Sequence, residues 1–128
     1  MDTEKIVKDY IDYTKSDKLK PEDKALFRNS VYLFHDLYIN DPEKAWELIV
    51  AIIDATDDEW VLTSVGCGEL ESLLVRHFDQ FIDRVVKNSR KNKKFAFVMS
   101  CVWPDDRISD EQYTILDNLV EELGIVRK

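Results

Sequence analysis

The chain has 128 residues, of which 45% are hydrophobic and 11% aromatic, so it suits one domain with one apolar core and is not a disordered chain. Its formal net charge of −8 argues against nucleic acid as the main ligand. Three glycines and three prolines are too few for a β-rich fold with many tight turns, and this scarcity favours long helices.

The hydrophobic periodicity is helical along nearly the whole chain. A first helix is predicted over about Thr3–Ser16. A second is predicted to begin at Pro21, a residue favoured in first turns, and to carry an apolar face as far as Tyr38. Asp41 and Pro42 then mark a boundary, where Asp41 caps a third helix. The apolar arc of this third helix is wide, so we expect it to lie centrally in the core.

The middle of the chain is predicted to form shorter helices. One begins at Asp57, and the glycines at Gly66 and Gly68 are expected to break the helical run. The next helix ends at His77, and another spans about Phe78–Ser89.

The apolar segment Phe95–Trp103 has a composition that would also suit a strand. Its neighbours are helical and no partner strand is evident, so we predict a buried helix that stops at Pro104. Ser109 and Gln112 then form a capping box for a final helix, and Gly124 is its C-terminal stop. The sequence therefore predicts an all-α fold with a single helical domain over residues 1–128. We expect seven or eight short helices in antiparallel hairpins, as a bundle or a short solenoid-like array.

Charge is distributed unevenly along the chain. From Asp36 to Asp83 there are twelve acidic and two basic residues, whereas six bases and no acid follow between Arg84 and Lys94. A field of one sign in a small protein favours a basic protein partner, although acids also serve solubility alone. The acids that we predict to bind a partner are Asp54, Asp57, Asp58, Glu59, Glu71, Asp79 and Asp83.

Some of these charged residues have local roles that compete with binding. Asp57, Asp58 and Glu59 lie at one predicted helix start, so we expect at least one of them to cap that helix. Glu69 is interpreted as a first-turn carboxylate, stabilised by the positive end of its helix. The basic stretch after Asp83 could contact phosphates, or it could simply pair with neighbouring acids.

The tryptophans Trp46, Trp60 and Trp103 lie within apolar patterns. We predict that they are core residues, although one partly exposed tryptophan would be a good anchor for a partner.

No arrangement of residues indicates catalysis or metal binding. His77 and Asp79 are two residues apart and do not face each other on a helix. No nucleophile stands beside a base, and no ligand set has metal-binding spacing. We therefore predict no enzymatic activity, no catalytic residue, no metal and no cofactor. A hydrolase that uses Glu71 and His77 is the least favoured alternative.

The chain is expected to be cytoplasmic. No apolar run approaches the ~20 residues of a membrane span, and the charged segment Met1–Tyr10 lacks the apolar core of a secretory signal. Cys67 and Cys101 lie far apart among apolar residues, which predicts reduced, buried thiols. We expect neither nucleic acid nor a membrane as the partner.

The segment Gly68–His77 reads GELESLLVRH and resembles the G-P-L-E-x-L-L-x-x-H-G motif of an uncharacterised bacterial family of small helical proteins. Glu69 stands in place of the proline of the motif, and Phe78 in place of its last glycine. The resemblance extends over about Asp41–Trp103. It implies a helical fold and assigns no activity.

In size and charge the chain is also similar to the immunity proteins of contact-dependent inhibition and other bacterial toxin systems. These proteins are small, cytosolic and often acidic, and each blocks one toxin, frequently a basic nuclease. We therefore expect a non-enzymatic bacterial immunity protein that neutralises a basic toxin domain through its acidic surface. The alternative from a different class is a helical scaffold or adaptor in a bacterial complex.

Overall fold

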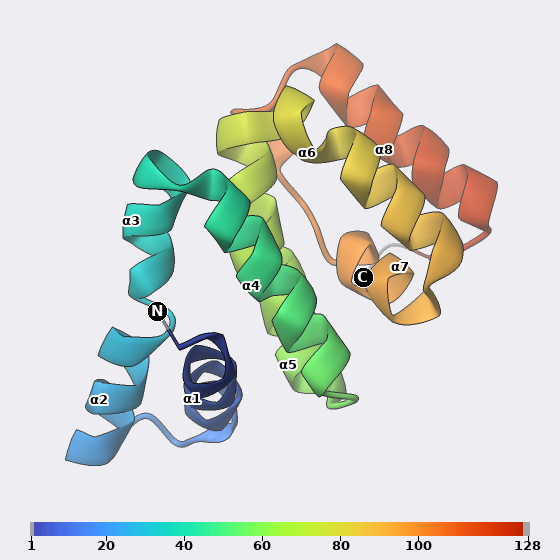
Figure 1. Cartoon of the computed structure of the whole chain (residues 1–128). Helices are drawn as coiled ribbons and strands as arrows, with labels where there is room; N and C mark the ends of the chain where they lie inside the picture. The colour runs from blue at the N-terminus through green and yellow to red at the C-terminus, as the bar shows by residue number, and fades with distance from the viewer. Residues whose placement is uncertain (1, 127–128) are drawn as a thin grey trace.

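The computed structural model describes residues 2–126, which are mostly helical and contain no strand (Figure 1). The predicted all-α class is confirmed. The helices are α1 (Thr3–Lys15), α2 (Pro21–Asn29), α3 (Leu33–Asn40), α4 (Pro42–Ala55), α5 (Glu59–Ser64), α6 (Glu71–Lys91), α7 (Lys93–Ser100) and α8 (Asp110–Leu123). A π-helical segment, Val65–Leu70, joins α5 to α6, and a 3-10 turn, Asp105–Arg107, precedes α8. Helix α5 has only six residues and continues directly into the π segment, so the two form one helical run.

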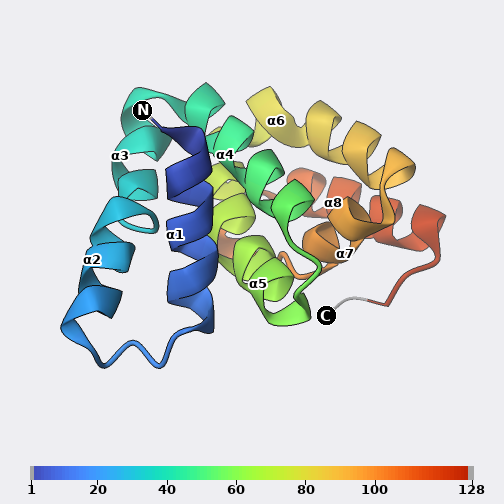
Figure 2. The ribbon, with the colours of Figure 1, turned by 60° about the horizontal axis from the view of Figure 1, so that its bottom comes forward.

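Helix α4 and the α5–π segment form the centre of the molecule. They run antiparallel, with α1–α3 on one side and the second half of α6, α7 and α8 on the other (Figures 1 and 2). As predicted, α4 lies in the core, since Leu48, Ile49 and Ile52 have no exposed surface. Helices α1 and α2 form a second antiparallel hairpin.

The single helix predicted from Pro21 to Tyr38 is wrong, because the chain turns between α2 and α3. Ser30 is fully buried there, and its backbone leaves the helical region at φ −138° and ψ −81°. Its hydroxyl donates to the carbonyl of Leu26 at 2.5 Å. A serine side chain that bonds nearby backbone competes with the helical hydrogen bonds, which explains the interruption.

The break predicted at Gly66 and Gly68 is also wrong, because the chain there is π-helical and continuous. A methyl group at position 66 would lie 2.3 Å from the carbonyl oxygen of Val98 and 2.7 Å from Cβ of Cys101. The missing side chain therefore lets α7 approach the π segment closely. The helix kinks instead at His77, with φ −139° and ψ 46°, which is the predicted boundary between two helices.

The predicted caps are largely confirmed. Asp41 accepts from the backbone of α4, and Ser109 and Gln112 make both hydrogen bonds of a capping box, at 3.1 and 3.0 Å. Gly124 ends α8 in the left-handed conformation, at φ +63°. The segment after Asn92 forms α7, so the choice of a helix over a strand is correct.

Trp46 is half-buried and links α4 to two other helices. Its ring stacks on Phe81 of α6 at 5.8 Å between centroids and meets Phe95 of α7 at 5.7 Å. It therefore packs against the core, as predicted.

We predict opposite outcomes for alanine at the two glycines of the π segment. Gly66→Ala should lower the free energy of unfolding by about 1–3 kcal/mol, because its methyl group meets backbone that cannot move aside. Gly68→Ala should leave stability unchanged or raise it by about 0.5–1 kcal/mol, because nothing lies within 4 Å of the added carbon. Urea unfolding of both variants is the measurement, and equal effects would contradict the close approach of α7.

Candidate functional site

The seven acids predicted to bind a partner do not form one surface. Asp54, Asp57, Asp58 and Glu59 lie at the turn between α4 and α5. Asp79 and Asp83 are exposed on α6, and Glu71 is buried. The seven residues therefore lie in three separate environments.

The turn between α4 and α5 carries four of these acids around the start of a helix. Asp58 is the N-cap of α5, where its carboxylate accepts from the backbone N–H of Val61 at 3.0 Å. Asp57 is almost fully exposed, and its only ion pair among the described residues is with Lys94 at 3.2 Å. Lys94 is also tied to the turn itself, since it donates to the carbonyl of Thr56 at 2.9 Å.

Trp60 follows directly after these acids and is 62% exposed, so its predicted place in the core is wrong. Its indole N–H donates to the carbonyl of Thr14, at the end of α1, at 3.3 Å. This hydrogen bond orients the ring while a large part of its surface stays open to solvent. We call the surface formed by Asp54, Asp57, Asp58, Glu59 and Trp60 the acidic corner.

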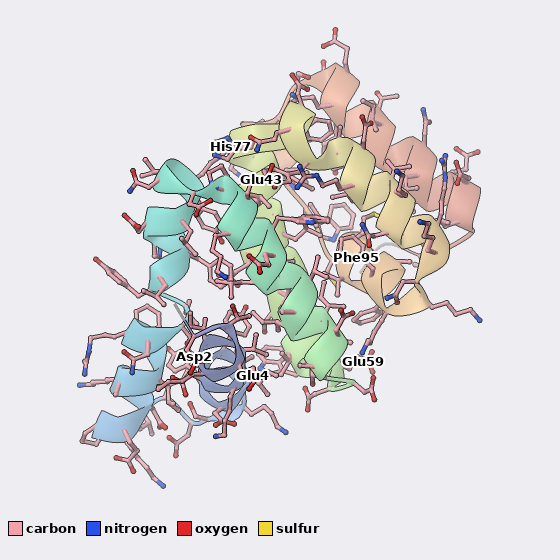
Figure 3. All side chains as sticks on the ribbon, in the orientation of Figure 1. Asp2, Glu4, Glu43, Glu59, His77 and Phe95 are labelled. Carbon is pink, nitrogen blue, oxygen red and sulfur yellow. The ribbon has the colours of Figure 1, made fainter. Side chains whose placement is uncertain are left out.

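A shallow apolar groove lies next to the acidic corner, between α1 and the end of α4. It has a volume of about 320 Å³ and is lined by Val7, Ile11 and Ala55. Glu4, Lys8 and Asp12 of α1 also line it, and Lys8 forms an ion pair with Asp12 at 2.6 Å, so the edge of the groove carries both signs of charge. Figure 3 shows Glu4 and Glu59 in the same half of the molecule, and Figure 2 shows α1 beside α5.

Asp79 and Asp83 belong to a different part of the surface. Gln80, which lies between them in the sequence, donates to Glu43 at 3.2 Å. Arg84, which follows Asp83, forms a two-armed ion pair with Glu43 at 2.5 and 2.8 Å. The Arg84 guanidinium lowers the pKa of Glu43. Glu43 lies in the first turn of α4, and the acidic corner lies at the other end of this helix, about 20 Å away for a helix of this length (Figure 3). A small contact surface centred on the corner would not include α6.

Glu71 is 8% exposed and cannot meet a partner at the surface. Its carboxylate accepts a hydrogen bond from the backbone N–H of Trp103 at 2.7 Å. It also forms an ion pair with Arg107. The prediction that Glu71 binds a partner is therefore wrong, because this side chain fastens the segment between α7 and α8. The hydrogen bond to Glu71 raises the pKa of Arg107. Trp103 itself is 40% exposed and is not a core residue.

Glu69 is a buried carboxylate of the π segment, and not the first-turn residue that the sequence predicted. The hydroxyl of Tyr10 in α1 donates to its carboxylate, and the hydroxyl of Tyr38 in α3 lies 3.4 Å from its carbonyl oxygen. Burial raises the pKa of Glu69 to about 7, although the hydrogen bond from Tyr10 opposes the shift. Burial also raises the pKa of Tyr10. The sequence signal that was missed is an acid inside an apolar helical run.

His77 and Glu71 have separate partners. The Nε2 atom of His77 lies 2.6 Å from the carbonyl oxygen of Tyr38, so the ring ties the kink of α6 to α3. The carboxylate of Glu71 is taken up by the segment before α8. A hydrolase that uses both groups would need each of them to give up these contacts.

Three of the six bases after Asp83 form ion pairs with acids. Arg84 pairs with Glu43, Arg90 pairs with Glu122 through two hydrogen bonds of 2.7 Å, and Lys94 pairs with the acidic corner. For these three bases the structure favours the interpretation as partners of acids.

The two cysteines differ in exposure. Cys101 is buried, as predicted, whereas Cys67 is exposed, so the prediction of a buried thiol there is wrong. The pKa of Cys67 is raised, mainly by partial burial and then by the negative charge of Glu71. Residues 2–126 include no group of three or more histidine, cysteine and acidic side chains placed to hold a metal ion. Within the same range, no helix has both the length and the apolar character of a bilayer span.

The fold and this surface define a small all-α protein with an acidic corner centred on an oriented tryptophan. The chain belongs to DUF6869, a family of unknown function, whose model matches residues 17–121. The match includes the acidic corner, the π segment and most of α8, and it begins after α1. No curated protein and no solved structure matches the chain. The resemblance of Gly68–His77 to a family motif stays a prediction.

We predict that Glu69 makes the protein less stable as the pH rises. The folded protein holds the proton of Glu69 up to about pH 7, whereas the unfolded chain releases it near the ordinary value of 4.5. This stabilisation is fully present below pH 4.5, the ordinary pKa, and is lost as the pH rises through about 7, the pKa in the folded protein. The free energy of unfolding should fall by roughly 3 kcal/mol over this range.

The test is urea unfolding of the wild type and of Glu69→Gln between about pH 5 and pH 8. The amide cannot ionise, so the variant should lack this part of the decline. Glu121→Gln, a change at an exposed acid of α8, should keep the decline of the wild type. Parallel curves for the wild type and Glu69→Gln would contradict the prediction.

Proposed function

We propose that this chain is a non-enzymatic immunity protein that binds a basic toxin domain through the acidic corner and blocks it by covering its surface. The proposal includes a bacterial, cytoplasmic setting, because immunity proteins act on toxins inside the cell. An adaptor of a bacterial complex that uses the same corner is the alternative.

The observation that carries the proposal is Trp60. Tryptophan is among the residues that most often dominate binding energy, because its large ring loses much surface to solvent on association. Here the ring is 62% exposed and is already oriented by its hydrogen bond to Thr14. A side chain held in place before binding loses less conformational entropy when the complex forms.

The charges around Trp60 support a basic partner. Asp54, Asp57 and Glu59 are exposed, and the chain as a whole carries a net charge of −8. Complementary fields accelerate encounter and disfavour partners of the wrong charge. The adjoining groove offers an apolar contact for hydrophobic residues of the partner, whereas the exposed acids of the corner suit its basic residues.

The test of function starts from parallel affinity captures from an extract of the source cells. One bait is the wild type, the second is Trp60→Ser with Asp57→Asn and Glu59→Gln, and the third is Asp79→Asn with Asp83→Asn. The proposed partner is basic, is retained by the first and third baits, and is lost from the second. A partner lost only from the third bait would place binding on α6 and contradict the proposal.

The captured partner is then purified and its toxic activity is titrated at a concentration well above the dissociation constant. Covering consumes one inhibitor for each toxin, so activity should fall linearly to zero near an equimolar ratio. Full protection at a small fraction of that ratio would indicate turnover and would favour the alternative that the protein is a hydrolase. A partner without toxic activity would support the adaptor.

We predict that the two helix-borne tryptophans Trp46 and Trp60 have different roles. Trp60→Ala should keep a nearly native melting temperature and weaken partner binding by about 2 kcal/mol or more. Trp46→Ala should lower the free energy of unfolding by about 3 kcal/mol, because its ring packs on Phe81 and Phe95. Thermal melting and calorimetric titration separate the two effects, and native binding by Trp60→Ala would contradict its role as anchor.

We predict that association is fast at low salt and slows as salt is added, because exposed charges are screened beyond ~8 Å at physiological ionic strength. Asp57→Lys with Glu59→Lys should lower the association rate constant by about tenfold and change dissociation much less. Asp79→Lys with Asp83→Lys is the matched control and should have a smaller effect. Surface plasmon resonance over a salt series is the measurement, and a salt-independent association rate would exclude electrostatic steering.

A further inference from the structure

A cavity separate from the acidic corner lies between the end of α6, α7 and the residues that follow α8. Its volume is about 690 Å³, within the range of roughly 300–1,000 Å³ that is typical of small-molecule sites. Figure 1 shows these three helices together on the side of α4 opposite to α1–α3. Phe97 of α7, Leu123 at the end of α8 and Ile125, which follows α8, give the cavity apolar walls.

The charge of this cavity is opposite to that of the chain. The described residues that line it include Arg90, Lys91 and Lys93 but no acid, in a chain with 26 acidic residues. The guanidinium of Arg90 already donates two hydrogen bonds of 2.7 Å to the carboxylate of Glu122. Lys91 and Lys93 are exposed and have no ion pair among the described residues, so their ammonium groups are open to an anion at the rim.

The wall also contains an unsatisfied polar group. The hydroxyl of Ser89 is inaccessible to solvent, its residue is 3% exposed, and it has no hydrogen-bond partner in the described structure. Leaving a buried polar group without a partner costs about 1–3 kcal/mol. Because this oxygen has no accessible surface, it is not among the groups that would hold a ligand in the cavity.

We propose that this cavity binds a small amphipathic carboxylate, with its hydrocarbon chain against Phe97, Leu123 and Ile125 and its head group at Lys91 and Lys93. Apolar walls with a few placed polar groups are the usual composition of a site for such a ligand. The site is independent of the proposed toxin binding, because none of the residues of the acidic corner lines it.

The experiment is a calorimetric titration of the whole protein with decanoate, kept below its critical micelle concentration, and with 1-decanol. Decanoate should bind at one site, and about tenfold more tightly than 1-decanol, because only the acid carries a head group for the lysines. Lys91→Gln with Lys93→Gln should weaken decanoate by about tenfold, whereas the control Lys87→Gln, outside the cavity, should change it by less than about twofold. Equal affinity of the double variant and the wild type would overturn the proposal.

A second variant tests the apolar walls. Ala96 lines the cavity, and Ala96→Leu should reduce its free volume and weaken decanoate and 1-decanol alike, while a native melting temperature shows that the variant folds. Amide shift changes in ¹H–¹⁵N spectra should centre on α7 and the end of α6. Changes centred on the groove beside α1 would overturn the assignment. Sedimentation with phosphatidylglycerol vesicles distinguishes a free acid from a lipid surface. Vesicle binding without decanoate binding would overturn the proposal.

Discussion

Two buried carboxylates on one helical run connect the two sides of this molecule. Glu69 and Glu71 are two positions apart, which places them about 200° apart around a helix, on nearly opposite sides. Glu69 bonds Tyr10 of α1, and Glu71 bonds Arg107 and the backbone before α8. The central run from α5 to α6 thus holds α1 on one side and the last segments on the other. Losing Glu69 would leave the buried hydroxyl of Tyr10 unpaired, which costs more than the bond itself contributes.

The close packing of this run depends on the absence of a side chain at Gly66. The backbone of α7 comes so near that even a methyl group would collide with Val98. The π-helical geometry of Val65–Leu70 accompanies this approach, and π-helical turns are rare and often occur at functional sites. In this protein the segment positions the two buried acids. Its role in the described structure is therefore to fix the arrangement of helices that displays the surface.

The acids and the bases on this surface have different surroundings. The acids of the corner cap α5 or face solvent around Trp60, whereas three of the six bases of the following stretch form ion pairs with acids elsewhere in the fold. Lys94 joins the two regions, since it pairs with Asp57 and follows Lys93 at the rim of the basic cavity. The proposed protein-binding corner and the proposed anion site are thus neighbours that share no lining residue. Each can be altered by substitutions that leave the other intact.

The sequence by itself determined the helical class, the caps at Asp41, Ser109 and Gly124, and the kink at His77. These features depend on local preferences, which act within a few residues. It also located the acidic segment that includes the corner. Only the tertiary structure decided that Trp60 faces solvent, that Glu69 and Glu71 are buried, and that α6 lies apart from the corner. Periodicity shows which side of a helix is apolar, but an acid or a tryptophan at its edge is buried or exposed according to which distant helix packs there.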